Sequence, residues 1–156
     1  MSPEGWSDVA TALRQASLRV TAPRVAVLSE LRVGQHLTAD QVAVGVRGRV
    51  GPISTQAVYD VLAALTRAGL LRRIEPAGSA TRYETRVGDN HHHVVCRGCG
   101  VIADVDCAVG EPPCLAPADA GGFVVDEAEI TFWGMCPVCQ TAVSERAVPE
   151  PELKES

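Results

Sequence analysis

Two Cys-x-x-Cys pairs, "CRGC" at residues 96–99 and "CPVC" at 136–139, constrain the second half of this chain more than any other feature. Four sulfur ligands at this spacing can close a tetrahedron around Zn²⁺, and a closed four-thiolate site is structural. The intervening residues, 100 to 135, exceed the usual spacing of a zinc ribbon, so the ion would fasten the ends of a small subdomain. We therefore predict a structural zinc site formed by Cys96, Cys99, Cys136 and Cys139.

Other uses of these cysteines depend on the compartment. The N-terminus lacks the basic and apolar regions of a secretory signal, and no run approaches the roughly 20 apolar residues of a membrane span. A cytoplasmic protein without membrane contact is expected. Two disulfides are the first alternative to zinc, and the reducing cytoplasm disfavours them. A redox dithiol is the second alternative, because "WGMCPVC" faintly resembles a thioredoxin-type loop. Against it, we expect neither a βαβ pattern around this loop nor a helix of useful length after it.

The three consecutive histidines at 91–93 indicate a second site of different character. If they lie on a strand, His91 and His93 point to one face, while His92 points to the other face together with Cys96. One ion could not easily collect both sets. The sequence therefore favours one sulfur-rich site and one site rich in nitrogen and oxygen.

Further ligands for the second site must come from elsewhere in the chain. Candidates are Asp104 on the next expected strand, Glu84 at the end of a hairpin, and His36 in a loop. The ordinary alternatives are a loop histidine for His36, a hairpin charge for Glu84 and the start of a solvated polar run for His91. Three imidazoles and two carboxylates without sulfur suit Fe²⁺, Mn²⁺ or Zn²⁺. The predicted regulatory set is His36, Glu84, His91, His93 and Asp104.

The first half reads as helices followed by a hairpin. Apolar periodicity predicts helices within residues 7–18, 21–33, 38–50 and 54–71. Expected N-caps are Ser7, Thr21 and Ser54, with a capping box formed by Thr38 and Gln41. The β-type runs "LLRRIEP" and "TRYETRV" then predict a hairpin that turns near Gly78.

Helices followed by a hairpin are typical of a helix-turn-helix with a wing, and the charge distribution agrees with a DNA partner. Residues 1–85 hold ten Arg against seven Asp or Glu, net +3, whereas residues 86–156 hold four basic and twelve acidic residues, net −8. The start of the last helix would read bases, and arginines would hold phosphates. The predicted DNA contacts are Ser54, Thr55, Gln56, Tyr59, Arg72, Arg73, Arg82 and Arg19. The alternative is a helical domain whose polar helix start faces only water.

The motifs "LRVTAPRVAVL", "HLTADQV", "STQAVYDVLAALTRAGLL", "RYE", "HHHVVCRGCG" and "CPVC", in this order, resemble the ferric uptake regulator family. The resemblance covers nearly the whole chain to residue 139, and the combination is highly specific. It implies an α+β homodimer with a winged-helix domain at 1–87, a zinc-stapled α/β dimerisation domain at 88–140 and a tail at 141–156. It also implies a repressor that binds palindromic AT-rich operator DNA when its sensor metal is present.

The resemblance carries over to individual residues. Cys96, Cys99, Cys136 and Cys139 fall on the structural zinc ligands of the family. His36, Glu84, His91, His93 and Asp104 fall on its sensory site, which spans the hinge between the two domains and takes Fe²⁺ or Mn²⁺, with Zn²⁺ as a further candidate.

Several residues depart from the family pattern. Asn90 and Ala128 stand where histidines of a third metal site would be expected, so that site is expected to be absent. Asp60 replaces an arginine common after "VY", which suggests an atypical operator. Prolines 112, 113 and 117 should shorten a family helix to a turn around residue 118.

The insertion "DVDCAVGEPPC" adds Cys107 and Cys114, which are either redox thiols or buried small hydrophobic residues. It resembles the actinobacterial branch of the family that is associated with catalase-peroxidase genes. We therefore predict a metal-dependent, redox-responsive repressor of oxidative-stress genes. The main rival is an iron-uptake or zinc-uptake repressor of the same family.

Two other functional classes, a zinc enzyme and an interaction module, fit the sequence less well. A zinc hydrolase or deaminase would need an open metal position and a glutamate base, in a His-x-Glu motif paired with Pro-Cys-x-x-Cys. Neither motif is present, so we predict no enzyme and no small-molecule substrate. A zinc-stapled interaction module would show no salt-dependent affinity for DNA.

Overall fold

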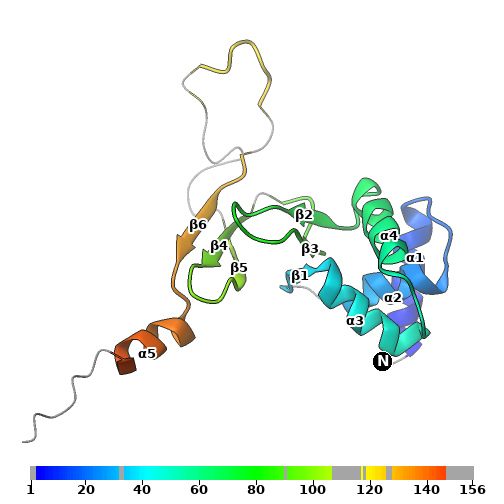
Figure 1. The fold of residues 1–156 in the computed structure, drawn as a ribbon. Helices are drawn as coiled ribbons and strands as arrows, with labels where there is room; N and C mark the ends of the chain where they lie inside the picture. The colour runs from blue at the N-terminus through cyan, green and yellow to red at the C-terminus, as the bar shows by residue number, and fades with distance from the viewer. Residues whose placement is uncertain are drawn as a thin grey trace, which may run out of the picture. The chain divides into compact units, whose positions relative to one another are not determined.

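The four helices predicted from apolar periodicity in the first half of the chain are present in the computed structural model. They are α1 (Pro3–Gln15), α2 (Ala22–Glu30), α3 (Ala39–Val50) and α4 (Thr55–Arg67). The structure describes residues 3–31, 34–89, 91–106, 117, 119–125 and 128–146. Two units are distinguished, Met1–Asn90 and His91–Ser156 (Figure 1). The four helices belong to the first unit, whose core includes Leu13, Val25, Val42, Val58, Leu62 and Leu65.

The helix starts follow local capping chemistry. Thr38 and Gln41 form the predicted capping box, and the Ser54 side chain accepts from the backbone N–H of Ala57. Thr21 occupies the predicted N-cap of α2, yet its side chain makes no capping hydrogen bond. The prediction for Ser7 was wrong, because α1 already begins at Pro3, a residue that the first helical turn tolerates.

A small antiparallel sheet completes the first unit. The predicted hairpin is present as β2 (Arg72–Ile74) and β3 (Arg82–Glu84), with Gly78 at φ +73° in the connection. A short strand that the sequence did not indicate, β1 (Leu37–Thr38), pairs with the other edge of β3. Tyr83 joins the helical core from β3. The sheet therefore fixes the residues at both ends of β1 and β3, including His36 and Glu84.

The second unit contains a three-stranded sheet of order β5-β4-β6. β4 (His92–Cys96) pairs antiparallel with β5 (Ile102–Val105) and parallel with β6 (Thr131–Gly134). The first register places His93 opposite Asp104, and the second places Cys96 opposite Gly134. Helices and sheets in both units confirm the α+β class. No helix among the described residues is both long and apolar enough to cross a membrane.

Helix α5 (Pro137–Arg146) follows β6 directly. The expectation that no helix of useful length follows the second Cys-x-x-Cys pair was therefore wrong. The helix also covers the first residues of the segment 141–156 for which a tail was predicted. Cys107, Cys114 and the turn around residue 118 lie outside the described residues.

Candidate metal centres and recognition helix

The two Cys-x-x-Cys pairs meet at one end of the second sheet. The parallel pairing of β4 with β6 brings Cys96 beside Gly134, and the backbone N–H of Arg97 donates to the Gly134 carbonyl at 2.7 Å. The second pair then follows within two residues of the strand end. As a result the sulfurs of Cys96, Cys99, Cys136 and Cys139 all lie within 4.8 Å of one another.

Backbone amides favour the thiolate state of one of these sulfurs, Cys96 Sγ. The N–H groups of Cys136 and Gly98 donate to Cys96 Sγ at 3.2 and 3.3 Å. Backbone donation from Cys136 and then from Cys99 lowers the pKa of Cys96 to about 6. In contrast, the side-chain contacts of Cys139 with Cys136 and then Cys99 raise the pKa of Cys139 to about 12.

Opposite pKa shifts inside one cluster have a simple electrostatic meaning. Sulfurs this close cannot all become thiolates unless a cation neutralises them, so some of the thiols retain protons when no ion is bound. A divalent ion that binds all four would displace these protons. The donor set therefore fits a structural Zn²⁺, whose preferred site is a closed tetrahedron of thiolates.

Gly98 allows the two Cys-x-x-Cys turns to approach each other. A Cβ atom built at this position would lie 2.9 Å from Cys139 Sγ, 3.2 Å from Cys139 Cβ and 3.2 Å from the terminal methyl group of Met135. These distances are shorter than a side chain tolerates without movement of its neighbours. The absence of a side chain at position 98 is thus a geometric requirement of the cluster.

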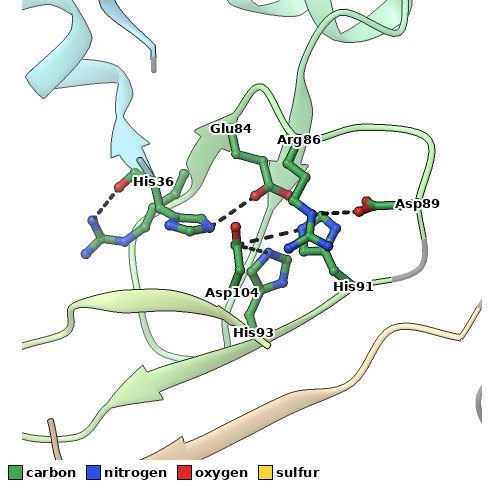
Figure 2. Close-up of polar contacts among 8 residues, drawn as sticks. His36, Glu84, Arg86, Asp89, His91, His93 and Asp104 are labelled. Atoms are coloured by element: carbon green, nitrogen blue, oxygen red, sulfur yellow. Dashed lines mark hydrogen bonds and ion pairs between the residues drawn. The ribbon is translucent and has the colours of Figure 1, made fainter. Parts of the chain in front are cut away.

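The first unit contributes a buried imidazole–carboxylate pair. Nε2 of His36, just before β1, lies 3.1 Å from Oε2 of Glu84 at the end of β3, and both side chains are 2% exposed (Figure 2). Arg82 fixes the His36 backbone, because its Nη1 donates to the His36 carbonyl at 3.2 Å. Two residues that are distant in sequence thereby form a rigid nitrogen–oxygen pair in the first unit.

The second unit contributes two imidazoles and a carboxylate. Nε2 of His91 and Nε2 of His93 lie 3.9 and 3.8 Å from Oδ1 of Asp104 (Figure 2). The ring centroids of His91 and His93 are 4.9 Å apart, whereas the centroid of the His92 ring lies 6.5 Å from that of Phe132. Separations near 4 Å exceed hydrogen-bond range, so neither of these Nε2 atoms is hydrogen-bonded to Asp104 Oδ1. Strand parity thus separates the histidines as the sequence indicated.

The polar residues proposed to read DNA are exposed at the start of α4. Ser54, Thr55, Gln56 and Tyr59 all lie on the surface, and Tyr59 is 44% exposed. Among the candidate phosphate contacts, Arg19 is exposed, Arg72 is half-buried, and Arg73 is held by Glu75 through a 2.5 Å ion pair. Arg82 is half-buried and is engaged with the His36 backbone.

Sequence reasoning missed two contacts at this helix. Arg47 of α3 donates from Nη2 to Thr55 Oγ1 at 3.1 Å and from Nε to the Ile53 carbonyl at 3.3 Å, so it ties α3 to the start of α4. Gln56 Nε2 donates to Asp60 Oδ1 at 2.9 Å. The second contact has a recognisable signal, since residues four apart on a helix are surface neighbours. The first depends on the turn between two helices and has no such signal.

Comparison with known proteins places this arrangement in a family. The model of the ferric uptake regulator family matches residues 15–131. The chain belongs to that family. It is 57% identical over 142 residues to the transcriptional regulator FurA of Mycobacterium tuberculosis, with 91% of this chain and 97% of the relative covered. It is also 58% identical over 126 residues to ferric uptake regulation protein 1 of Mycolicibacterium fortuitum, with coverage of 81% and 78%. Family membership makes the chain a transcriptional regulator and not an enzyme.

Solved structures of ferric uptake regulators share the fold. The regulator of Helicobacter pylori aligns with a TM-score of 0.63 at 21% identity, covering 88% of this chain and 92% of that one. The regulator of Vibrio cholerae aligns with a TM-score of 0.62 at 23% identity, covering 81% and 98%. These similarities show that this chain has the α+β fold of the solved ferric uptake regulators.

Proposed function

We propose that this regulator is a metal-dependent, redox-responsive repressor of oxidative-stress genes, catalase-peroxidase genes among them. The observation that carries the proposal is the presence of two donor sets of opposite character. One set is four sulfurs in the second unit. The other set is nitrogen and oxygen, with His36–Glu84 in the first unit and the His91, His93 and Asp104 side chains in the second. Sulfur retains Zn²⁺, whereas nitrogen and oxygen suit an exchangeable Fe²⁺ or Mn²⁺.

The first unit is the proposed DNA-binding part, because a helix with an exposed polar start is followed by a hairpin. Helix α4 would enter the major groove with Ser54, Thr55, Gln56 and Tyr59 near base edges, as in other winged helices. Arg19, Arg72 and Arg73 would contact phosphates. The partner is double-stranded operator DNA, and the regulator would act as a cytoplasmic homodimer whose sulfur-bound zinc holds the second unit together.

The nitrogen and oxygen donors supply the proposed regulatory response. Neither unit alone offers a full coordination sphere: the first offers His36 and Glu84, the second offers His91, His93 and Asp104. If one ion takes ligands from both units, it restricts their relative orientation. Binding would then select the DNA-competent state from a broader ensemble, and DNA would raise the affinity for metal by the same factor.

Redox sensitivity has two proposed routes. When bound, Fe²⁺ supplies reactivity toward peroxide, and His36 and His91 are the side chains proposed to be oxidised. In the other route peroxide oxidises the thiols of Cys107 and Cys114, which lie outside the described residues, to a disulfide with release of two waters. Either change would weaken DNA binding and derepress a peroxide-removing enzyme.

The decisive experiment measures DNA binding and chemical modification together. The purified protein is footprinted on its own promoter and neighbouring genes, without added metal and with Fe²⁺ or Mn²⁺. The Fe²⁺ form is then treated with stoichiometric peroxide, and the peptides are analysed by mass spectrometry. We expect metal-dependent protection that peroxide abolishes, with either one oxygen on a His36 or His91 peptide or a reducible Cys107–Cys114 crosslink. A Cys107→Ser variant separates the routes, since it blocks only the crosslink.

The second candidate is an iron-uptake or zinc-uptake repressor. It is favoured by the similarity to ferric uptake regulation protein 1 of Mycolicibacterium fortuitum. In that case the protein would stay bound to DNA and unmodified after peroxide, and its occupancy would follow metal concentration alone. Protection of uptake genes in place of a catalase-peroxidase promoter would support the same reading.

A further inference from the structure

A polar pair on the surface of α4 gives the proposed recognition helix a feature that its individual residues do not have. Gln56 and Asp60 lie one turn apart, both are exposed, and Gln56 Nε2 donates to Asp60 Oδ1 at 2.9 Å. Both residues line a cleft of about 430 Å³ that also includes Tyr59 on the same helix and Arg73 and Thr81 of the hairpin region. The pair is thus accessible at the face proposed to meet DNA.

The contact fixes the orientation of the Gln56 carboxamide. A glutamine side chain carries a carbonyl oxygen at one corner and an NH₂ group at the other, and in solvent it can present either. An ionised carboxylate only accepts hydrogen bonds. Asp60 therefore holds the NH₂ corner of Gln56, because a reversed amide would place two acceptors against each other. One N–H and the carbonyl oxygen of Gln56 remain for a further partner.

That remaining pair of groups matches one base. In the major groove adenine offers an acceptor at N7 and a donor at N6, and Gln pairs with both. Guanine offers two acceptors at N7 and O6, so it can take only the N–H of Gln56. A locked carboxamide thus favours adenine more strongly than one that can rotate.

The charge of Asp60 acts in the same direction. Arg73, the cation in the same cleft, is bonded to Glu75 at 2.5 Å, and within residues 34–89 Asp60 forms no ion pair. No cation within these residues therefore pairs with the carboxylate on the exposed surface of α4. It would repel the two acceptors of guanine and accept from the exocyclic amine of an adjacent adenine or cytosine. Discrimination often combines such an attractive contact with a repulsive one.

We propose that Asp60 is a positioning residue for operator specificity: it holds Gln56 in the orientation that reads adenine, and its charge disfavours guanine at the same position. This inference rests on the proposed DNA-binding function of α4. It assigns a role to the acidic side chain that replaces the arginine expected from the family pattern. It also identifies which base the helix start should select.

The test measures base preference with the full-length protein and Mn²⁺. Duplexes carry the footprinted operator or a single A·T to G·C change at each half-site position, and competition titrations give the ratio of affinities. We compare wild type with four variants: Gln56→Ala, Asp60→Ala, Asp60→Asn and the double variant Gln56→Ala/Asp60→Ala. Asp40→Asn is the matched control, because it removes the same charge from the same cleft, whereas the side-chain N–H of Gln56 donates to Asp60.

We expect wild type to prefer A·T over G·C by about tenfold or more at one position of each half-site, the range of a good bidentate contact. Asp60→Ala, Asp60→Asn and Gln56→Ala should each reduce this ratio, while Asp40→Asn should preserve it. The double variant should lose less than the sum of the losses in Gln56→Ala and Asp60→Ala, because Asp60 acts partly through Gln56. A wild-type ratio in Asp60→Ala, or a uniform change like that of Asp40→Asn, would overturn the inference while the proposed function stands. Wild type without any sequence preference would overturn both.

Discussion

The backbone N–H of Cys136 donates to Cys96 Sγ at 3.2 Å, so one Cys-x-x-Cys pair stabilises the thiolate of the other before any metal arrives. We predict that Cys96→Ser and Cys136→Ser each lose the structural zinc and the dimer together, because the binding free energy of a structural ion is folding free energy. Zinc content by elemental analysis and mass by sedimentation equilibrium measure the two losses. Cys107→Ser is the control and should retain both. A stable zinc-free dimer from either ligand variant would refute the structural assignment.

Substitution at Gly98 should weaken zinc retention without removing a ligand. In Gly98→Ala the new Cβ would lie 2.9 Å from Cys139 Sγ, so the two turns must separate. We expect zinc to be lost to a chelator about tenfold faster, the lower end of the effect of changes next to metal ligands. Gly134→Ala is the matched control, since a Cβ there meets no atom within 4 Å. Equal rates in the two variants would contradict the close approach of the turns.

Removal of a regulatory imidazole should separate metal response from folding. His91→Ala and His93→Ala should keep zinc, fold and dimerise, yet lose Mn²⁺-dependent operator binding, because each removes a proposed ligand of the exchangeable ion. His92→Ala is the comparison, since its ring lies beside Phe132 and not beside the other two histidines. Mobility-shift titrations with and without Mn²⁺ measure the response. Wild-type binding by the His91 and His93 variants would place the sensory site elsewhere.

The two threonine N-caps should differ in their contribution to stability. Thr38→Ala removes both the side-chain acceptor for Gln41 N–H and the capping box, at a cost of about 1 kcal/mol in the free energy of unfolding. Thr21→Ala removes no capping hydrogen bond and should stay within about 0.5 kcal/mol of wild type. Urea denaturation followed by circular dichroism compares them. A larger loss in Thr21→Ala would show that the capping geometry is not decisive.

Base reading and phosphate contact should respond differently to salt. Tyr59→Ala removes an exposed ring from the proposed recognition helix, and it should weaken binding to the operator much more than binding to random DNA. Arg19→Ala should weaken binding to every duplex and lower the slope of log affinity against log salt by about one. Titrations at several salt concentrations on both DNAs distinguish them. Equal effects on operator and random DNA by both variants would undo this division of roles.

Local patterns predicted the parts of the fold that depend on neighbouring residues. The helices, the capping box of Thr38 and Gln41, the hairpin and the alternation of His91, His92 and His93 follow from spacing within a few residues. The start of α1 and the helix that begins at Pro137 were misjudged, because a proline and a Cys-x-x-Cys motif each fit both a helix start and a loop.

Pairing between distant segments could not be read from the sequence in the same way. The strand β1 has two residues and owes its existence to the edge of β3, not to any propensity of its own. The parallel contact of β4 with β6 joins segments that are separated by the whole of β5 and the residues after it. The candidate ligands were found by residue type, but the 3.1 Å approach of His36 to Glu84 depends on how β1 and β3 pair.

The parallel pairing of β4 with β6 also sets an order of events during synthesis. Helices α1 to α4 and the hairpin are complete once Glu84 has been made, so the first unit can fold as soon as it leaves the ribosome. Cys96 and Cys99 emerge next, but their partners lie beyond β6 and cannot reach them until Cys139 has cleared the exit tunnel. Throughout this interval the nascent chain carries Cys96 and Cys99 without the other two sulfurs of the cluster. A four-sulfur site can therefore close around zinc only at the end of synthesis, after the first unit has already been made.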